Sequence, residues 1–225
     1  MPQTEGTLTR DQVLRLLSQK SAWNSWRETC NRSVVDLSGV DISGRNLSGY
    51  DLRRVGLTRC IARQTVFARA DLYRARFTQA SCIGADFSHS ILINATADRA
   101  DFCGSDFSSV IAQGLDAPNS SFIGCKMMHG NFVGMKASFS QFEGALLTSA
   151  DVSGSDLSYA DLINAELDGT NINQVELCKA KILPEQLLHT ANWFYIKNNL
   201  ELTLQVFQLI RKKIIDIHIP NLPNP

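Results

Sequence analysis

The residues able to do chemistry recur too regularly along this chain to mark a single site. An Asp precedes an apolar residue again and again, at Asp71, Asp86, Asp101, Asp106, Asp151, Asp156 and Asp161. Carboxylates act as a general acid and base only where a pocket gives them different environments. Because these seven recur with a repeat, we expect them to have structural or solvating roles.

The cysteines are spread singly rather than in metal-binding or redox pairs. They are Cys30, Cys60, Cys82, Cys103, Cys125 and Cys178, and no CxxC occurs. We therefore expect reduced thiols, as in a cytosolic protein. The sequence also lacks a phosphate loop and a nucleophile elbow. These features predict a protein that is not an enzyme and has no catalytic residue, cofactor or metal.

A repeat of five residues positions these side chains. From Leu37 to Ile182 all thirty positions spaced by five are apolar, with no insertion or deletion. The residue two before each of these central positions is usually small, and Asp or Asn often directly precedes them. On a helix, apolar residues spaced by five would be distributed around the whole surface, and on a flat strand they would alternate between the two faces. The pattern therefore predicts a solenoid whose chain turns once per repeat.

The repeat resembles the pentapeptide-repeat family, whose unit is a small residue, Asp or Asn, Leu or Phe, and two variable positions. Ala150-Asp151-Val152-Ser153-Gly154 shows the unit, and the resemblance covers about two-thirds of the chain. It implies an all-β solenoid, a right-handed quadrilateral parallel β-helix with twenty residues per coil and α-helical caps at both ends. In such a coil the small side chain of Ala97 would share a cross-section with the large rings of Phe102 and Phe107, so the core volume would be conserved. Phenylalanines twenty residues apart would stack in two columns. The columns are Phe67, Phe87 and Phe107, and Phe102, Phe122 and Phe142.

The segment 1-32 predicts an N-terminal helical cap. Thr9 suits a helix N-cap, and Trp23 and Trp26 would form an apolar lid over the first coil. Bacterial pentapeptide proteins resemble this chain here, with a Trp-Asn-x-Trp-Arg stretch before the first repeats. The β-helix would then occupy 33-183.

The segment 184-225 predicts a C-terminal helical cap and tail. Its apolar spacing favours helices over 184–196 and about 200–216. The second helix carries more apolar surface than one end coil needs. The excess predicts a homodimer or a docking surface for another protein, formed by Leu200, Leu204, Phe207, Ile210 and Ile214.

Outward positions are where a filled solenoid can carry function. Twenty residues per coil would gather an apolar group on one face: Tyr73, Ile91, Ile93, Ile111 and Val133. A thinner stripe would lie on the opposite face: Ile83, Cys103, Ile123 and Ile163. A basic cluster would lie at one corner: Arg54, Arg59, Arg74, Arg76 and Arg99. We predict that the first apolar group and the arginines bind a partner; alternatively, these residues only cover the sheet, because β-branched side chains suit strands.

Charge is balanced over the chain but not along it. The 22 basic and 22 acidic side chains cancel, which does not indicate nucleic acid or a membrane as a partner. Residues 45–99 hold nine Arg and four Asp (+5), whereas residues 100–180 hold three Lys and ten acids (−7). No segment reaches about 18 apolar residues or forms a signal-peptide core. We expect a soluble cytoplasmic protein without a Sec signal.

Two classes of function fit these features. The first, which we predict, is a rigid scaffold that binds a protein partner of unknown identity. The second is a DNA mimic that inhibits or protects a type II topoisomerase. Pentapeptide proteins of the quinolone-resistance type resemble B-DNA in width and negative charge, and they dimerise through a C-terminal helix. The acidic half fits that resemblance, whereas the arginine-rich half and overall neutrality do not. A secreted bacterial effector is a third open alternative.

Overall fold

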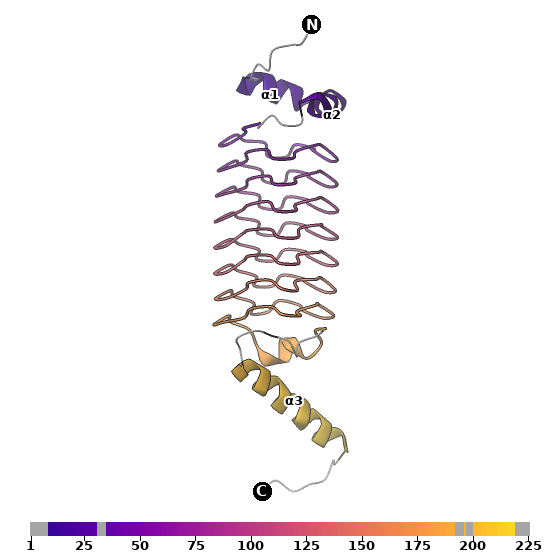
Figure 1. The fold of residues 1–225 in the computed structure, drawn as a ribbon, viewed down its shortest axis with the longest axis vertical. Helices are drawn as coiled ribbons and strands as arrows, with labels where there is room; N and C mark the ends of the chain where they lie inside the picture. Colours follow the sequence, from indigo (N-terminus) through magenta and orange to yellow (C-terminus); the bar gives the residue numbers. More distant parts are fainter. Residues whose placement is uncertain (1–8, 31–34, 192–195, 197–199, 219–225) are drawn as a thin grey trace.

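Coils stack into a rod with helices at both of its ends (Figure 1). The computed structural model describes residues 9–30, 35–191, 196 and 200–218. Parallel bridges join residues twenty apart, beginning with Asp36 to Gly56 and Asp41 to Ile61. The predicted twenty-residue coil and the helices at both ends are therefore confirmed.

Each five-residue unit contains one parallel bridge and one tight turn. In the first unit the Val40 amide donates to the Leu37 carbonyl over 3.1 Å, and Gly39 has a φ of +68°. Positive φ at the third residue alone is typical of a type II turn. Every fifth residue from Gly39 to Lys179 has positive φ, and these comprise eleven glycines and eighteen other residues. The fold therefore places many ordinary side chains in left-handed backbone at its corners.

The recurring aspartates stabilise these turns. The Oδ1 atom of Asp86 accepts a hydrogen bond of 2.9 Å from the amide of Ser88, two residues later. The same contact, between 2.9 and 3.2 Å, occurs at the other six aspartates singled out in the sequence. Their predicted structural role is confirmed, because each carboxylate satisfies a backbone donor of its own turn.

Both predicted phenylalanine columns fill the core. Ring centroids are 4.9 Å apart between Phe67 and Phe87 and 4.8 Å apart between Phe87 and Phe107. In the second column Phe122 lies 5.3 Å from Phe102 and 5.0 Å from Phe142. These stacked rings occupy the middle of the rod, and the alanine centres beside them are fully buried. The size compensation that the sequence predicted is therefore present.

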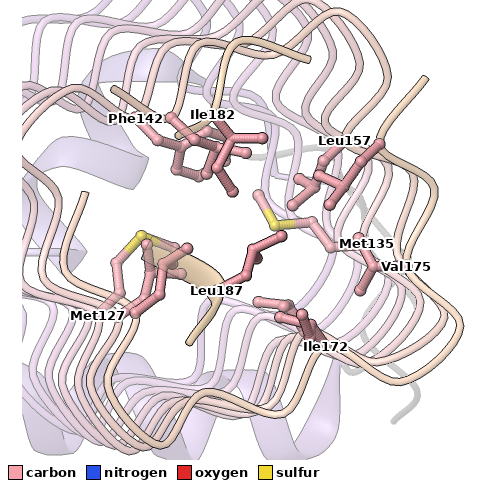
Figure 2. A pocket seen from close by; sticks show the side chains of 13 residues that line it. Met127, Met135, Phe142, Leu157, Ile172, Val175, Ile182 and Leu187 are labelled. Carbon is pink, nitrogen blue, oxygen red and sulfur yellow. The ribbon is translucent and has the colours of Figure 1, made fainter. Parts of the chain in front are cut away.

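Aliphatic side chains replace the rings toward the C-terminal end and leave a narrow void (Figure 2). Its volume is about 20 Å³, and Met127, Met135, Val152, Leu157 and Ile172 are among the residues that line it. A void of this size is comparable to one or two water molecules, and an apolar lining keeps it dry. The interior has no room for a substrate, so any binding site must lie on the outside of the rod.

Two helices cover the first coil, α1 (Arg10–Leu16) and α2 (Lys20–Thr29). Thr9 caps α1 as predicted: its Oγ1 accepts from the Gln12 amide, and Gln12 Oε1 accepts from the Thr9 amide over 2.8 Å. Trp23 is fully buried in the core cluster, and Trp26 packs against that cluster. The predicted tryptophan lid is confirmed. Residues 1–8 of the predicted cap segment 1-32 lie outside the described residues.

The C-terminal end differs from the prediction of a helix over 184–196. Within the described residues 184–191, a short 3-10 helix, η1 (Pro184–Leu187), takes the place of the predicted longer helix. The coil then continues, because Leu187 is fully buried in the register of five and Ala191 bridges to Asn171. Residues 182 and 187 keep the solenoid spacing of five, which overrides the local helical pattern up to Ala191. The rest of the predicted helix, with Trp193 and Phe194, lies outside the described residues.

The second predicted C-terminal helix is present as α3 (Leu200–His218). Leu202 and Val206 are buried, and Ile210 is partly buried against the core. Leu204 and Phe207 are about half exposed, at 51% and 49%. No described helix has the length and apolar character needed to cross a bilayer.

Candidate interaction surface

The four outward sides of the rod are numbered in chain order by their columns of bridges. The columns begin at Asp36 for side 1, Asp41 for side 2, Asn46 for side 3 and Asp51 for side 4. In each unit the centre and the residue two before it are mostly buried, and the other three residues are mostly exposed or half-buried. Recognition therefore depends on these three positions, repeated at about 4.8 Å from coil to coil.

Side 4 gathers the apolar residues that the sequence predicted for one face. Ile91 and Ile111 are direct bridge partners. The carbonyls of Tyr73, Ile93 and Val133 accept from the preceding coil, which places these residues in the neighbouring column. Ile111 and Val133 are 41% and 37% exposed, and the other three are half-buried. We call these five residues the apolar strip.

The corner between sides 4 and 1 changes character along the rod. Its column holds three large polar residues, Arg54, Arg74 and Asn94, with φ between +54° and +59°. The next three positions are Gly114, Gly134 and Gly154, with φ between +65° and +69°. Side 4 is therefore edged by long polar side chains from Arg54 to Asn94 and by glycines from Gly114 to Gly154, after which Gln174 follows in the same column.

The predicted arginine cluster is divided between two corners. Arg54 and Arg74 lie at the corner of sides 4 and 1, with Arg76 beside them on side 1. Arg59 and Arg99 lie at the next corner, in a column where Gln79 separates them. The interpretation as one cluster is wrong, because five residues advance the chain by one side. Arg59 Nε donates to Gln79 Oε1 over 2.7 Å, and Arg99 pairs with Asp98 at 3.2 Å.

A charged network joins α2 to the start of side 4. Arg53 Nε donates to Asp51 Oδ1 over 2.8 Å, and buried Arg27 lies 3.8 Å from the same carboxylate. Burial raises the pKa of Asp51, but the hydrogen bonds from Arg53 and the charge of Arg27 outweigh it and hold that pKa below its ordinary value. Burial lowers the pKa of Arg27. These groups have a structural role, and Arg54 and Arg74 are the solvent-facing cations of this corner.

A surface feature that the sequence did not reveal lies at the corner of sides 1 and 2. The rings of Phe139 and Tyr159 stack with centroids 4.5 Å apart and an angle of 8°, and they are 57% and 43% exposed. Lys179 Nζ lies 5.3 Å from the Tyr159 centroid. The signal in the sequence was their spacing of twenty, two residues after a centre. Bulky residues are uncommon in left-handed backbone, and stacking offsets part of that strain.

The thinner apolar stripe on the opposite side is also present. The carbonyls of Ile83, Cys103 and Ile123 accept from successive coils, so these residues share one column of side 2 with Ile163. All four are half-buried. Side 2 thus supplies isoleucines in the same repeat position as Ile93, which makes them matched controls for it.

The other candidate chemical groups are dispersed. In the described ranges no group of three or more His, Cys, Asp or Glu residues could hold a metal ion. His89 and His129 lie in one corner column with Ser109 between them. All six cysteines are free thiols. Burial raises the pKa of the Cys125 thiol to about 12 and also raises that of Cys82, beside Cys60.

The comparison with protein families agrees with this geometry. Eight copies of the family described as pentapeptide repeats match, over residues 51–81, 70–108 and 138–174. The chain belongs to the pentapeptide-repeat family, and its fold is the right-handed quadrilateral β-helix of that family. No curated protein matches the chain.

Solved structures share the fold at low sequence identity. HetL, a pentapeptide repeat protein involved in heterocyst differentiation regulation from the cyanobacterium Nostoc sp. strain PCC 7120, is 16% identical with a TM-score of 0.58. That match covers 78% of this chain and 93% of HetL. Full-length QnrB1, a plasmid-mediated fluoroquinolone resistance protein, is 20% identical with a TM-score of 0.56, over 79% of this chain and 98% of QnrB1. At these identities the likeness shows the fold alone.

Proposed function

We propose that this protein is a non-enzymatic interaction scaffold that binds a protein partner through side 4. The apolar strip is the observation that carries this proposal. The core is already filled, so Ile111 and Val133, which are 41% and 37% exposed, add nothing to it through their exposed parts. Burying such partly exposed side chains against a partner contributes about 1 kcal/mol each. Contiguous apolar surface with a polar edge is typical of a protein-binding site.

Arginines supply the polar edge of this surface. Arg54 and Arg74 flank the strip at the corner of sides 4 and 1, and Arg76 lies beside them on side 1. Arg59 and Arg99 extend the basic surface to the far corner of side 1. We propose that these residues select a partner with acidic side chains around an apolar centre, because complementary charge governs specificity and the association rate.

Catalysis has little support from this geometry. The recurring carboxylates bind the amides of their own turns, and the apolar void of about 20 Å³ is too small for a substrate. The strip itself offers flat apolar surface without paired acid and base groups. A rigid rod with outward side chains at fixed spacing suits recognition better than reaction.

The test is capture of protein partners by purified, immobilised variants. Ile93→Asp with Ile111→Asp places two charges in the strip and is expected to abolish capture. Ile83→Asp with Ile61→Asp places two charges at the same repeat positions on side 2 and should leave capture intact. Circular dichroism establishes that both variants fold. Equal capture by the two variants would remove side 4 from the proposal.

Helix α3 is a second candidate surface. Leu204 and Phe207 are about half exposed on it, whereas Ile210 packs partly against the core. The side chains of Leu200 and Ile214 lie outside the described part of α3. We propose that the exposed face of α3 docks another protein or a second copy. Leu204→Glu should then reduce association of the protein with itself or with a partner. If the variant keeps the same molecular mass in solution and captures the same proteins, α3 is a cap only.

DNA mimicry is the alternative function. The acidic residues between 100 and 180 favour it, with a formal balance of −7. The arginines at two corners of side 1 oppose it, because a DNA mimic needs acidic surface along its whole length. A gyrase supercoiling assay with purified protein tests this function. Inhibition or protection from a quinolone at micromolar concentration would replace the scaffold proposal.

A further inference from the structure

Side 4 is self-complementary about the point midway between Ile91 and Ile111, which are bridge partners in adjacent coils. A two-fold axis that crosses the rod at this point would reverse the order of the coils and keep each column opposite itself. Such an axis generates an isologous dimer, in which one patch contacts its own copy. We propose that the partner of side 4 is a second copy of this chain, packed face to face and antiparallel. This inference rests on the proposed function of side 4.

Apolar residues meet apolar residues at the centre of this arrangement. Ile91 of each copy lies opposite Ile111 of the other, and Tyr73 lies opposite Val133, because each pair is equidistant from the midpoint in its column. Ile93 lies opposite Gln113, whose Oε1 is already shielded from solvent. In the isoleucine column Asp71 lies opposite Asn131, so association removes apolar surface from water and also desolvates these two polar side chains.

Side-chain size is complementary at the corner. The change from large residues to glycine occurs between Asn94 and Gly114, at the same midpoint. The axis therefore places Arg74 of one copy over Gly134 of the other, and Arg54 over Gly154. Each long side chain meets a position without a side chain, so the two flat faces can approach closely. A parallel arrangement would lose this match.

Charge is complementary at the ends of the interface. Arg54 of each copy lies opposite Gly154 of the other, in the same five-residue unit as Asp151, which its long side chain can approach. Inside one chain Asp151 Oδ1 accepts from the Ser153 amide over 2.9 Å, which leaves its second oxygen for a cation. Asp51, the residue opposite Asp151 in the same column, is compensated by Arg53 and Arg27. On the outward positions of side 4 itself, the first half carries three Arg and two Asp (+1) and the second half carries Asp151 (−1), so antiparallel packing sets a weakly basic half against a weakly acidic one.

The size of the surface sets the expected strength. From Asp51 to Asp151 side 4 spans five coil steps, roughly 24 Å long and about 10 Å wide for three outward residues. This is smaller than a standard interface of about 800 Å² per partner. We therefore expect a dimer with a Kd in the micromolar range, which tightens at low salt.

Sedimentation equilibrium of the full chain tests the proposal. The wild-type protein is expected to change from monomer to dimer between about 1 and 100 µM. Ile111→Asp should keep it monomeric, and Ile61→Asp, at the same repeat position on side 2 and equally exposed, should dimerise like wild type. Circular dichroism and thermal melts establish that each variant folds.

Charge reversal tests the antiparallel register. Arg54→Asp alone should weaken the dimer about tenfold, because two symmetric pairs change from attraction to repulsion. Asp151→Arg alone should weaken the dimer by the same amount. Combining the two substitutions should restore the dimer affinity to within about threefold of the wild-type value. Asp101→Arg is the matched control, because Asp101 holds the same turn contact on side 2, opposite side 4, and should not respond to Arg54→Asp. A combined variant as weak as the single ones would overturn the proposed register.

The outcomes separate this proposal from the function on which it rests. A chain that stays monomeric at about 100 µM while side 4 captures a different protein would overturn the homodimer and retain the scaffold. A dimer that Leu204→Glu disrupts and Ile111→Asp does not would also overturn it, in favour of α3. If Ile111→Asp alters neither the molecular mass in solution nor the capture of other proteins, both the homodimer and the role of side 4 in the scaffold are wrong.

Discussion

Trp23 donates a hydrogen bond of 2.7 Å from its indole Nε1 to the backbone carbonyl of Asp51. In the next residue of α2, Asn24 Oδ1 accepts from the Asp51 amide over 3.0 Å, and its Nδ2 donates to the Gly49 carbonyl over 3.1 Å. These side chains satisfy backbone groups at the exposed end of side 4. The cap therefore closes an open sheet edge as well as the apolar core.

Removal of the indole should strongly destabilise the protein. Trp23 is fully buried, so Trp23→Ala is expected to lower the free energy of unfolding by about 3–5 kcal/mol. Trp23→Phe keeps much of the packing but leaves the Asp51 carbonyl without this donor, for an expected loss of about 1–3 kcal/mol. Urea denaturation followed by circular dichroism measures both. Ser25→Ala, at an exposed position of α2, is the control, and an equal effect there would contradict the lid.

Acid should weaken the junction between cap and rod. The pKa of Asp51 lies below its ordinary value, so its contribution to stability is complete above about pH 4 and is lost as pH falls through the lowered pKa. Unfolding free energies measured from pH 6 to pH 2.5 should decline below about pH 4. Asp51→Asn should flatten that decline. An identical pH profile for the variant would show that Asp51 does not contribute to it.

Thiol reactivity should follow burial. Cys60, Cys82 and Cys125 are fully buried, and the pKa of Cys125 is raised to about 12, so these thiols should resist alkylation in the native protein. Cys30 and Cys178 are partly exposed and should react first. Cys103 should react more slowly, because burial raises its pKa. Iodoacetamide labelling read by mass spectrometry checks this order, and all six should react in denaturant.

The void in the C-terminal half predicts opposite effects of the same substitution at two sites. Val152 lines the void, so Val152→Ile adds one methylene to free space and should stabilise by up to about 0.8 kcal/mol. Val110 is buried away from the void, so Val110→Ile should overpack the core at a cost of about 1–3 kcal/mol. Thermal unfolding compares them. Equal destabilisation by both would argue that the void is filled.

The sequence predicted those features of the fold that follow from the strict five-residue spacing. A period of five with matched centre volumes was sufficient to derive the coil and both phenylalanine columns. The apolar strip followed as well, because residues twenty apart, such as Ile91 and Ile111, must be neighbours. The thirty units share one register, so each such assignment supports the others.

Other features depended on competition between local and global preferences. Leu187, Leu188 and Ala191 fit a helix as well as they fit the solenoid, and only the coil beneath them favours the solenoid up to Ala191. The twenty-residue coil was predicted correctly, but the arginines were expected at one corner, whereas each step of five residues moves the chain to the next side and separates Arg59 and Arg99 from Arg54 and Arg74. The stacked pair Phe139 and Tyr159 was missed because corner positions usually carry small or polar residues, so aromatic ones there were not compared across coils.

Hydroxyl-radical footprinting at low and high protein concentration tests most directly whether side 4 is the surface through which two copies of the chain associate. Oxidation reports exposure at each side chain, and the strip, the aromatic corner and α3 all contain reactive residues. The account predicts that Tyr73, Ile91, Ile111 and Val133 become protected as concentration rises, while Phe139 and Leu204 remain equally reactive. Protection confined to Leu204 and Phe207, or absent from all of these residues, would contradict it.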